Sequence, residues 1–583
     1  MAINPAEVPL HFTFYLILSL PFLLPTFFFR GFSLSSFALV FSLAPFLYWT
    51  IFKISDFLWS HFCISKMREK NRKKQGERLK GVIIGGGFGG IGQAVQLLNI
   101  GIDNFIILDK NPNFGGTWIE NTYPNCACDV ASHVYSFSYF PNPFWSHKFS
   151  SQKEILRYAQ NMADHYGLAK HAQFNSQVVT AHYNKATKLW TLTSKNVHTG
   201  EITTHKDLNF VISAVGQLNS PTTPKFAGLE DFKKPVYHSV GLTSDVDLEG
   251  KKVACIGFGP SAVQILPHLA NNSGHLFSFI RSTSYTNDRY QHAYPSPVCY
   301  LFSFLPPIRM MYRWLIGTCT SFFIWNFAIQ RDTLHGSLKH MCKQKIEREL
   351  GNNMELRAQL ACDETPFCKR ILISDELLPA LARPNVTIYR SPKQSLKSFT
   401  EGGIIVASND GKEEEIDVDL VVMATGFKTT QFLSSFQVSA GEGDEPTLFL
   451  KDQWGAAGEN TEAYYGILIS NFPNLFALYG PHTNRGADSI IFMLECQQWY
   501  VANCINLLAS SPSEAPTLTV KKSAMEKFTK IYDETVKTLS FGGACTSWYR
   551  VGGDGRIINN CHLSGVGYWW ETLWVNEGDI EVK

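Results

Sequence analysis

Apolar residues are concentrated in two long runs near the N-terminus. Residues 10–29 read LHFTFYLILSLPFLLPTFFF, about the length that crosses a bilayer, and residues 32–52 form a second run. The stretch from Lys66 to Lys80 then holds eight basic residues against two acidic ones. Because basic flanks stay on the cytosolic side, we expect residues 1–78 to be a transmembrane anchor and basic linker, with the rest of the chain in the cytosol. The endoplasmic reticulum is the default membrane for such an anchor. A hairpin in one leaflet and a cleaved signal peptide are the alternatives.

The pattern changes after the basic stretch, where short apolar runs alternate with segments of helical periodicity. Residues 81–110 read as strand, glycine turn, helix and strand, with Gly85, Gly87 and Gly90 at the positions of G-x-G-x-x-G. The first glycine permits the tight turn, the second lets the backbone approach a pyrophosphate, and the third lets the helix pack on the strand. Asp109 ends the second strand, at the offset of a carboxylate that binds ribose hydroxyls. Together these features predict a dinucleotide-binding unit.

A second unit of the same kind begins at Lys252. Gly257 and Gly259 fill the first two glycine positions, and Ala262 takes the third, where glycine or alanine is accepted. The strand that follows ends in Arg281 rather than in an acid. A guanidinium can bind the 2′-phosphate of NADPH in a bidentate fork, so NADPH is the predicted ligand. The alternative is a surface arginine at the end of a strand.

Two dinucleotide units in one chain indicate an oxidoreductase that moves hydride from one cofactor to another. Strands that recur with helices predict an α/β fold with parallel sheets, namely two Rossmann-like dinucleotide-binding domains behind a transmembrane segment. A structure with only one cleft able to admit a dinucleotide would overturn this interpretation. A net charge of +2 gives no reason to expect a nucleic-acid partner, and we expect no metal site.

The 13 cysteines argue against one class of flavoprotein. No two of them form a CxxC or CxxxxC pair, and Cys126 and Cys128 are separated by a single residue. A dithiol reductase needs a close cysteine pair for thiol–disulfide exchange, so the spacing argues against this class. We expect the cysteines to be free thiols in a reducing compartment.

Seven further motifs are spread over the chain. They are GGTWIENTYPNCACD at 115–129, SSQKEILRYAQNMADHYGL at 150–168, SAVGQLNSPTTPKFAGLEDF at 213–232, CKRILISDELLPALARPNV at 368–386, ATGF at 424–427, NFPNLFALYGPHTNRG at 471–486 and CTSWYRVGGDGR at 545–556. Together with the two glycine turns, this set resembles the Baeyer–Villiger monooxygenases, within the class B flavin monooxygenases. The resemblance covers the chain from residue 81 onward.

The resemblance implies a defined chemistry. NADPH reduces FAD, O2 adds to the reduced flavin to give a C4a-peroxyflavin, and one oxygen atom enters an organic substrate, here a ketone that becomes an ester or lactone. Arg370 matches the active-site arginine that supports the anions formed and contacts the nicotinamide, and Asp129 matches its carboxylate partner beside the flavin. Lys369 matches the residue that helps Arg281 bind the 2′-phosphate. The alternative for each is a structural ion pair or a surface charge.

The predicted cofactor contacts fall into two sets. The FAD set comprises Gly85, Gly87, Phe88, Gly90, Asp109, Thr117, Trp118, Asn121, Asp129 and Tyr135. The NADPH set comprises Gly257, Gly259, Pro260, Ser261, Ala262, Arg281, Ser282, Lys369 and Arg370. Trp118 taken alone would more often be a core aromatic residue.

The linker between the two units departs from the family pattern F-x-G-x-x-x-H-x-x-x-W/D. Phe232 and His238 are kept, but Lys234 replaces the glycine and Leu242 replaces Trp or Asp. A lysine does not easily replace a glycine at positive φ. Asn125 replaces the glycine of YPG, where asparagine tolerates a left-handed backbone. The alternatives to ketone oxidation are therefore N- or S-oxygenation, an uncoupled NADPH oxidase that releases peroxide, and a catalytically impaired membrane flavoprotein that acts as a scaffold or sensor.

The domain plan follows from these units. Residues 79–233 begin the FAD domain, residues 234–384 form the NADPH domain, and residues 385–583 complete the FAD domain with a C-terminal cap. Residues 300–329 are apolar and aromatic but are interrupted by two arginines, which predicts a helical excursion over the active site, at the membrane surface. An anchor beside such an excursion favours a lipophilic substrate. The sequence does not indicate an oligomeric state.

Overall fold

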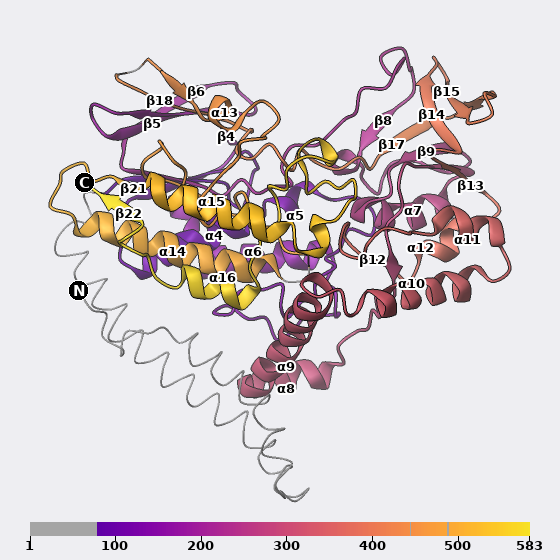
Figure 1. Ribbon diagram of the computed structural model, residues 1–583, viewed down its shortest axis with the longest axis horizontal. Coiled ribbons are helices and arrows are strands. Elements are labelled where there is room, and N and C mark those ends of the chain that lie inside the picture. The colour runs from indigo at the N-terminus through magenta and orange to yellow at the C-terminus, as the bar shows by residue number, and fades with distance from the viewer. Residues whose placement is uncertain (1–78, 444, 487–488) are drawn as a thin grey trace, which may run out of the picture.

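The computed structural model describes residues 79–443, 445–486 and 489–583 (Figure 1). The membrane anchor expected in residues 1–78 lies outside the described residues. Within the described part of the chain, no helix combines the length and the apolar character that a membrane span requires.

The first dinucleotide unit forms a five-stranded parallel sheet in the order β20-β7-β1-β2-β3. Every residue of β1 and β7 is buried, because a parallel sheet is covered on both faces and its strands are apolar throughout. The predicted strand–turn–helix–strand unit is confirmed. Its elements are β1 (Gly81–Ile84), α4 (Phe88–Asn99), β2 (Phe105–Leu108), β3 (Ala172–Gln173), β7 (Phe210–Ser213) and β20 (Leu475–Ala477).

A C-terminal helix, α14 (Ile490–Ser510), packs against α4 (Figure 1). The Gln498 side chain donates hydrogen bonds to the carbonyl oxygens of Phe88 and Gly89, at 3.3 and 3.1 Å. Gly92 faces the same amide, and an added Cβ there would lie 2.4 Å from it. The glycines of α4 therefore allow close packing by a helix that lies some 400 residues later in the chain.

The second dinucleotide unit is a separate parallel sheet in the order β13-β10-β9-β17-β8. The sheet continues to Met423, past residue 384, where the sequence pattern placed the end of the NADPH domain. Its elements are β8 (Val236–His238), β9 (Lys252–Ile256), α7 (Pro260–Asn272), β10 (His275–Ile280), α12 (Leu377–Leu381), β13 (Val386–Arg390) and β17 (Leu420–Met423).

Two antiparallel assemblies flank the parallel sheets. One is β4 (Ser176–Asn184), β5 (Leu189–Asn196), β6 (Ile202–Leu208), β18 (Gln437–Gly441) and β19 (Leu448–Phe449). Of these, β4 and β18 pair in parallel. The other is β14 (Gln394–Phe399), β15 (Gly403–Ser408) and β16 (Glu413–Asp417). The short pairs are β11 (Thr286–Asn287) with β12 (Leu372–Ile373), and β21 (Leu518–Val520) with β22 (Ile580–Val582).

The apolar stretch predicted as a helical excursion is helical, as expected. It forms α8 (Ser296–Phe304), α9 (Pro306–Thr318) and the π-helical turns η5 (Cys319–Phe323) and η6 (Trp325–Ile329). The remaining helices are α5 (Thr117–Glu120), α6 (Gln152–His165), α10 (His335–Leu350), α11 (Met354–Leu360), α13 (Leu450–Trp454), α15 (Lys522–Val536) and α16 (Gly565–Thr572). In Figure 1, α8 and α9 project from the lower side of the molecule.

The expectation of free thiols is wrong for one pair of cysteines. Cys368 and Cys545 form a disulfide, with their Cα atoms 6.2 Å apart. They are 177 residues apart in sequence, so no local spacing of cysteines predicts this disulfide. The bond joins the segment that carries Lys369 and Arg370 to the C-terminal part of the chain.

Candidate active site

A cavity of about 1400 Å³ lies between the two parallel sheets, and both glycine turns line it. The volume exceeds the roughly 300–1,000 Å³ of an ordinary small-molecule pocket, as a site for two dinucleotides requires. The two sites are arms of one continuous cavity rather than separate clefts. All the predicted contact residues line it except Gly90 and Ala262, which lie behind the turns.

The first glycine turn has the backbone geometry that the motif demands. Gly85 has φ of 109°, and an added Cβ there would lie 2.6 Å from the carbonyl oxygen of Ala214. At Gly90 an added Cβ would lie 1.9 Å from the carbonyl oxygen of Gly85, which is the close helix–strand approach expected of the third glycine. Gly87 is the N-cap of α4 and lines the cavity.

The second turn repeats this geometry. Gly257 has φ of 121°, and its added Cβ would lie 2.3 Å from the carbonyl oxygen of Ala424. An added Cβ at Gly259 would meet no described atom within 4 Å, so the backbone here faces open space. Ala262 is fully buried against the sheet. Arg281 follows β10 and is exposed at the rim of the cavity.

Asp109 is held by the glycine turn itself. Its carboxylate accepts hydrogen bonds from the backbone N–H groups of Gly86 and Asn111. Burial raises the pKa of Asp109, and these two hydrogen bonds oppose the rise. Because each carboxylate oxygen has two acceptor sites, Asp109 keeps capacity to bind a hydroxyl in the cavity.

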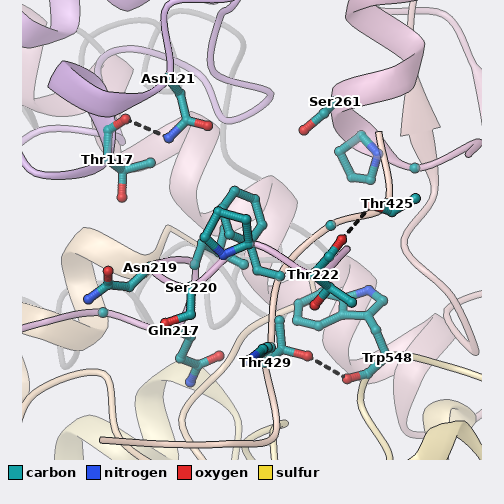
Figure 2. A pocket seen from close by; sticks show the side chains of 18 of the residues that line it. Thr117, Asn121, Gln217, Asn219, Ser220, Thr222, Ser261, Thr425, Thr429 and Trp548 are labelled. Atoms are coloured by element: carbon teal, nitrogen blue, oxygen red, sulfur yellow. Dashed lines mark hydrogen bonds between the residues drawn. The ribbon is translucent and has the colours of Figure 1, made fainter. Parts of the chain in front are cut away.

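The predicted flavin-contact residues lie together on one wall. Thr117 and Asn121 belong to α5 and its C-cap, and the Asn121 amide donates to the Thr117 carbonyl oxygen at 2.8 Å (Figure 2). The Trp118 indole donates to the Tyr135 hydroxyl at 3.2 Å, with the two rings edge to face. The hydrogen bond and the ring contact hold Trp118 and Tyr135 together on this wall.

Arg370 and Asp129 form an ion pair on the cavity wall. Arg370 Nη2 lies 2.6 Å from Asp129 Oδ1, although the two residues are 241 positions apart in sequence. About 30% of each side chain is exposed, toward the cavity that both residues line. The Asp129 charge raises the pKa of Arg370 above its already high usual value, so the guanidinium stays charged.

Lys369 also lines the cavity, where its ammonium lies 2.6 Å from Glu364. A phosphate in this arm would therefore compete with Glu364 for the lysine. Arg281 and Ser282 line the same cavity.

The departures in the linker are accommodated by the fold. Lys234 is exposed, and its φ lies outside the left-handed region. The backbone strain expected of a lysine in place of glycine is therefore absent. Leu242 is 1% exposed and belongs to the core. His238 keeps its contact with the ATGF segment through Nε2 and the Gly426 carbonyl oxygen, 3.1 Å apart. Asn125 has φ of 64°, as the sequence predicted.

Several further residues line the cavity, and all of them except Thr429 lie in the quoted motifs. Figure 2 shows Gln217, Asn219 and Ser220 across the cavity from Thr117, with Thr222, Thr425, Thr429 and Trp548 beside them. They follow β7 or β17, or belong to the C-terminal cap, and a position just after a buried parallel strand was the available signal. Thr425 donates to the Thr222 carbonyl oxygen at 2.5 Å, and Thr429 to that of Trp548 at 3.0 Å.

Gln264 was missed altogether. It lies on α7 of the second unit, and its amide bonds to the first unit: it accepts from the Tyr123 hydroxyl at 3.0 Å and donates to the Ala127 carbonyl oxygen at 2.9 Å. It thereby ties the segment that carries Asp129 to the second glycine turn.

Comparison with known proteins agrees with this geometry. The sequence profile of flavin-binding monooxygenase-like proteins matches residues 80–442. The chain belongs to the flavin-binding monooxygenase-like family. It is accordingly a flavin-dependent monooxygenase. It is 34% identical to a Baeyer–Villiger monooxygenase of Streptomyces coelicolor, over 81% of this chain and 87% of the relative. It is 32% identical to the FAD-binding monooxygenase ktnD of Aspergillus niger, over 86% of this chain and 81% of the relative.

Solved structures share the fold. A closed structure of cyclohexanone monooxygenase superposes with a TM-score of 0.74 at 22% identity, covering 87% of this chain and 99% of that one. A complex of OTEMO with FAD and NADP gives the same TM-score at 23% identity, with the same two coverages.

Proposed function

We propose that the chain is an FAD- and NADPH-dependent monooxygenase that inserts one oxygen atom of O2 into a ketone to give an ester or lactone. The observation that carries this proposal is the Arg370–Asp129 ion pair, which faces the cavity between the two glycine turns. The Baeyer–Villiger relative from Streptomyces coelicolor supports the choice of reaction.

The described residues fit two dinucleotides. Neither α4 nor α7 has a side-chain cap among the described residues, and both begin at a cavity-lining glycine, Gly87 or Gly259. Uncapped N–H groups at a helix N-terminus bind phosphate oxygens well. Asp109 suits the ribose of FAD, and Arg281 with Lys369 suits the 2′-phosphate of NADPH.

Bound FAD and NADPH would supply the hydride and the activated oxygen; the chain supplies position and charge. Asp129 holds the Arg370 guanidinium at a fixed place, so its charge is preorganised toward the reacting carbonyl. Arg370 stabilises the negative charge that develops on the carbonyl oxygen, and because it stays protonated it needs no proton transfer to do so. The wall of Trp118 and Tyr135 excludes water on one side of this centre.

We further propose that the substrate is lipophilic and that the enzyme is attached by residues 1–78 to a membrane, by default the endoplasmic reticulum, with its catalytic part in the cytosol. The support is the pair of apolar runs and the basic stretch that follows them. Alkaline extraction of a membrane fraction tests the attachment, because an integral protein stays with the lipid.

The proposed reaction is tested on the purified full-length protein under ¹⁸O2, with a panel of ketones, amines and sulfides. The expected product is an ester or lactone that carries one labelled atom, with NADPH bleaching the flavin absorbance without substrate. Labelled N- or S-oxides without any ester would refute ketone oxidation but would still show a monooxygenase. Failure of NADPH to bleach the flavin would refute the enzyme and favour a scaffold or sensor.

A further inference from the structure

The outward face of the α8–α9 projection, residues 296–323, exposes apolar side chains to an unusual degree. Phe304 is 77% exposed, Tyr300 55% and Leu315 53%. Leu301, Phe322 and Phe323 are exposed on the same projection. Phe144, exposed on the neighbouring loop, extends the surface, with its ring 5.8 Å from that of Tyr300. The rings of Tyr300 and Phe304 also stack, at 6.2 Å. A gathering of exposed apolar side chains of this kind marks a contact with another body.

The charged side chains of the projection face the body of the protein and not the outward face. Its charged residues are Arg309 and Arg313 alone. Arg313 donates to the carbonyl oxygen and hydroxyl of Ser136 at 2.9 and 3.0 Å, and Arg309 donates to the Phe302 carbonyl oxygen at 3.2 Å. Both guanidinium groups are thus used to hold the projection to itself and to the body. The outer face is left without charge, which suits a hydrocarbon or interfacial environment rather than a polar partner.

The inner face is a close aromatic contact with the cavity wall. The His133 ring lies 5.1 Å from Phe302 and 5.4 Å from Tyr312, both edge to face. His133 belongs to the segment that contains Asp129 and Tyr135, which line the cavity. The projection therefore packs on the back of that wall.

We propose that the outer face of residues 296–323 docks into the surface of a lipid bilayer. Docking rests on the membrane attachment proposed above, which alkaline extraction tests separately. Residues 1–78 supply two apolar runs of bilayer-spanning length shortly before β1, so the catalytic body is expected within reach of a membrane. Aromatic side chains are favoured at the level of lipid headgroups. Trp570 and Trp574 of the α16 region are also exposed, and α16 lies on the same lower side as α8 and α9 (Figure 1).

Photo-crosslinking tests the contact in the full-length holoprotein. p-Benzoylphenylalanine is placed at position 304 and, as a control of similar exposure, at position 202 on β6, where Ile202 is 65% exposed. The protein is reconstituted in phosphatidylcholine–phosphatidylserine vesicles that contain an alkyne-tagged lipid. The expected result is at least a tenfold higher yield of lipid adduct at 304 than at 202. Crosslinks from 304 to residues 1–78 or to a second copy, or equal lipid yields at the two positions, would overturn the proposal.

Docking would also bring the wall that carries Asp129 close to the lipid. Delivery of substrate from the lipid to this wall then rests on the proposed reaction with a lipophilic ketone. Phe304→Ser with Leu315→Ser is then expected to raise KM for a vesicle-partitioned ketone several-fold, at unchanged kcat and unchanged KM for NADPH. Ile202→Ser is the control. An unchanged ketone KM would refute the delivery role, whereas a loss of all turnover in the unmodified protein would refute the reaction and leave the crosslinking result standing.

Discussion

Replacing Arg370 by alanine separates a catalytic guanidinium from a structural one. About 30% of each side chain of the Arg370–Asp129 pair is exposed. The cost of breaking the pair therefore lies between the roughly 0.2–1 kcal/mol of a fully exposed pair and the roughly 3–5 kcal/mol of a fully buried one. The loss of one preorganised charge at a developing oxyanion lowers kcat by about 10²–10³-fold, or about 3–4 kcal/mol. We therefore expect Arg370→Ala to lose product formation by at least a hundredfold while the melting temperature changes by only a few degrees. Asp129→Asn keeps the shape but frees the guanidinium, and should lose roughly tenfold to a hundredfold.

The assay is product formation per bound flavin under saturating NADPH, together with flavin content and thermal unfolding. Arg357→Ala is the matched control, because Arg357 forms a similar pair with Glu347 at 2.7 Å, outside the cavity. Near-normal product formation in Arg370→Ala would refute the assigned role. Equal losses in Arg357→Ala and Arg370→Ala would show that both act through folding.

Three further predictions follow from buried geometry. Gly90→Val should yield protein without flavin absorbance, because its Cβ would lie 1.9 Å from the Gly85 carbonyl oxygen; normal flavin content would refute the close approach. Cys545→Ser removes a cross-link over 177 residues, worth up to about 5 kcal/mol in the chain-entropy description, so reductant should lower the melting temperature of the wild type but not of the variant. Burial lowers the pKa of His562 from 6.5 to about 4. The neutral imidazole therefore contributes about 3 kcal/mol to the free energy of unfolding above pH 6.5, and this contribution is lost as the pH falls toward 4. Urea midpoints between pH 7 and 4 should fall less in His562→Gln than in the wild type or in the exposed control His198→Gln.

Much of the fold can be predicted from the sequence because the motifs that specify it are local. The turn at Gly85, the acid at Asp109 and the second turn at Gly257 each depend on residues within about thirty positions, and the structure places all three as expected. The strand Val386–Arg390 shows what local patterns do not predict. Its apolar character marks a strand, but which sheet it joins depends on pairing with β10, more than a hundred residues earlier.

The candidate site shows the same division. Arg370 and Asp129 were paired only through resemblance to a family, because no periodicity links residues 241 positions apart. The contacts of Gln264 and the Cys368–Cys545 bond had no such guide and were missed. Each is made between elements that the fold alone brings together, so side-chain identity at either end carries too little information to pair them.

The two crossings between the dinucleotide units explain why the linker tolerates its departures from the family pattern. The chain leaves the first unit after β7 and returns to it after β17, and the two crossings are bonded to each other: Thr222 N–H donates to the Gly426 carbonyl oxygen at 2.8 Å, and Thr425 donates back to Thr222. His238 adds a third bond to Gly426. Any change in the angle between the units must bend both crossings together, because the side chains of Thr425 and His238 and the backbone of Thr222 all join them. Lys234 is exposed and Leu242 is packed in the core, so neither takes part in this coupling. Of the family pattern, the chain keeps His238, which bonds to the second crossing, and alters Lys234 and Leu242, which do not.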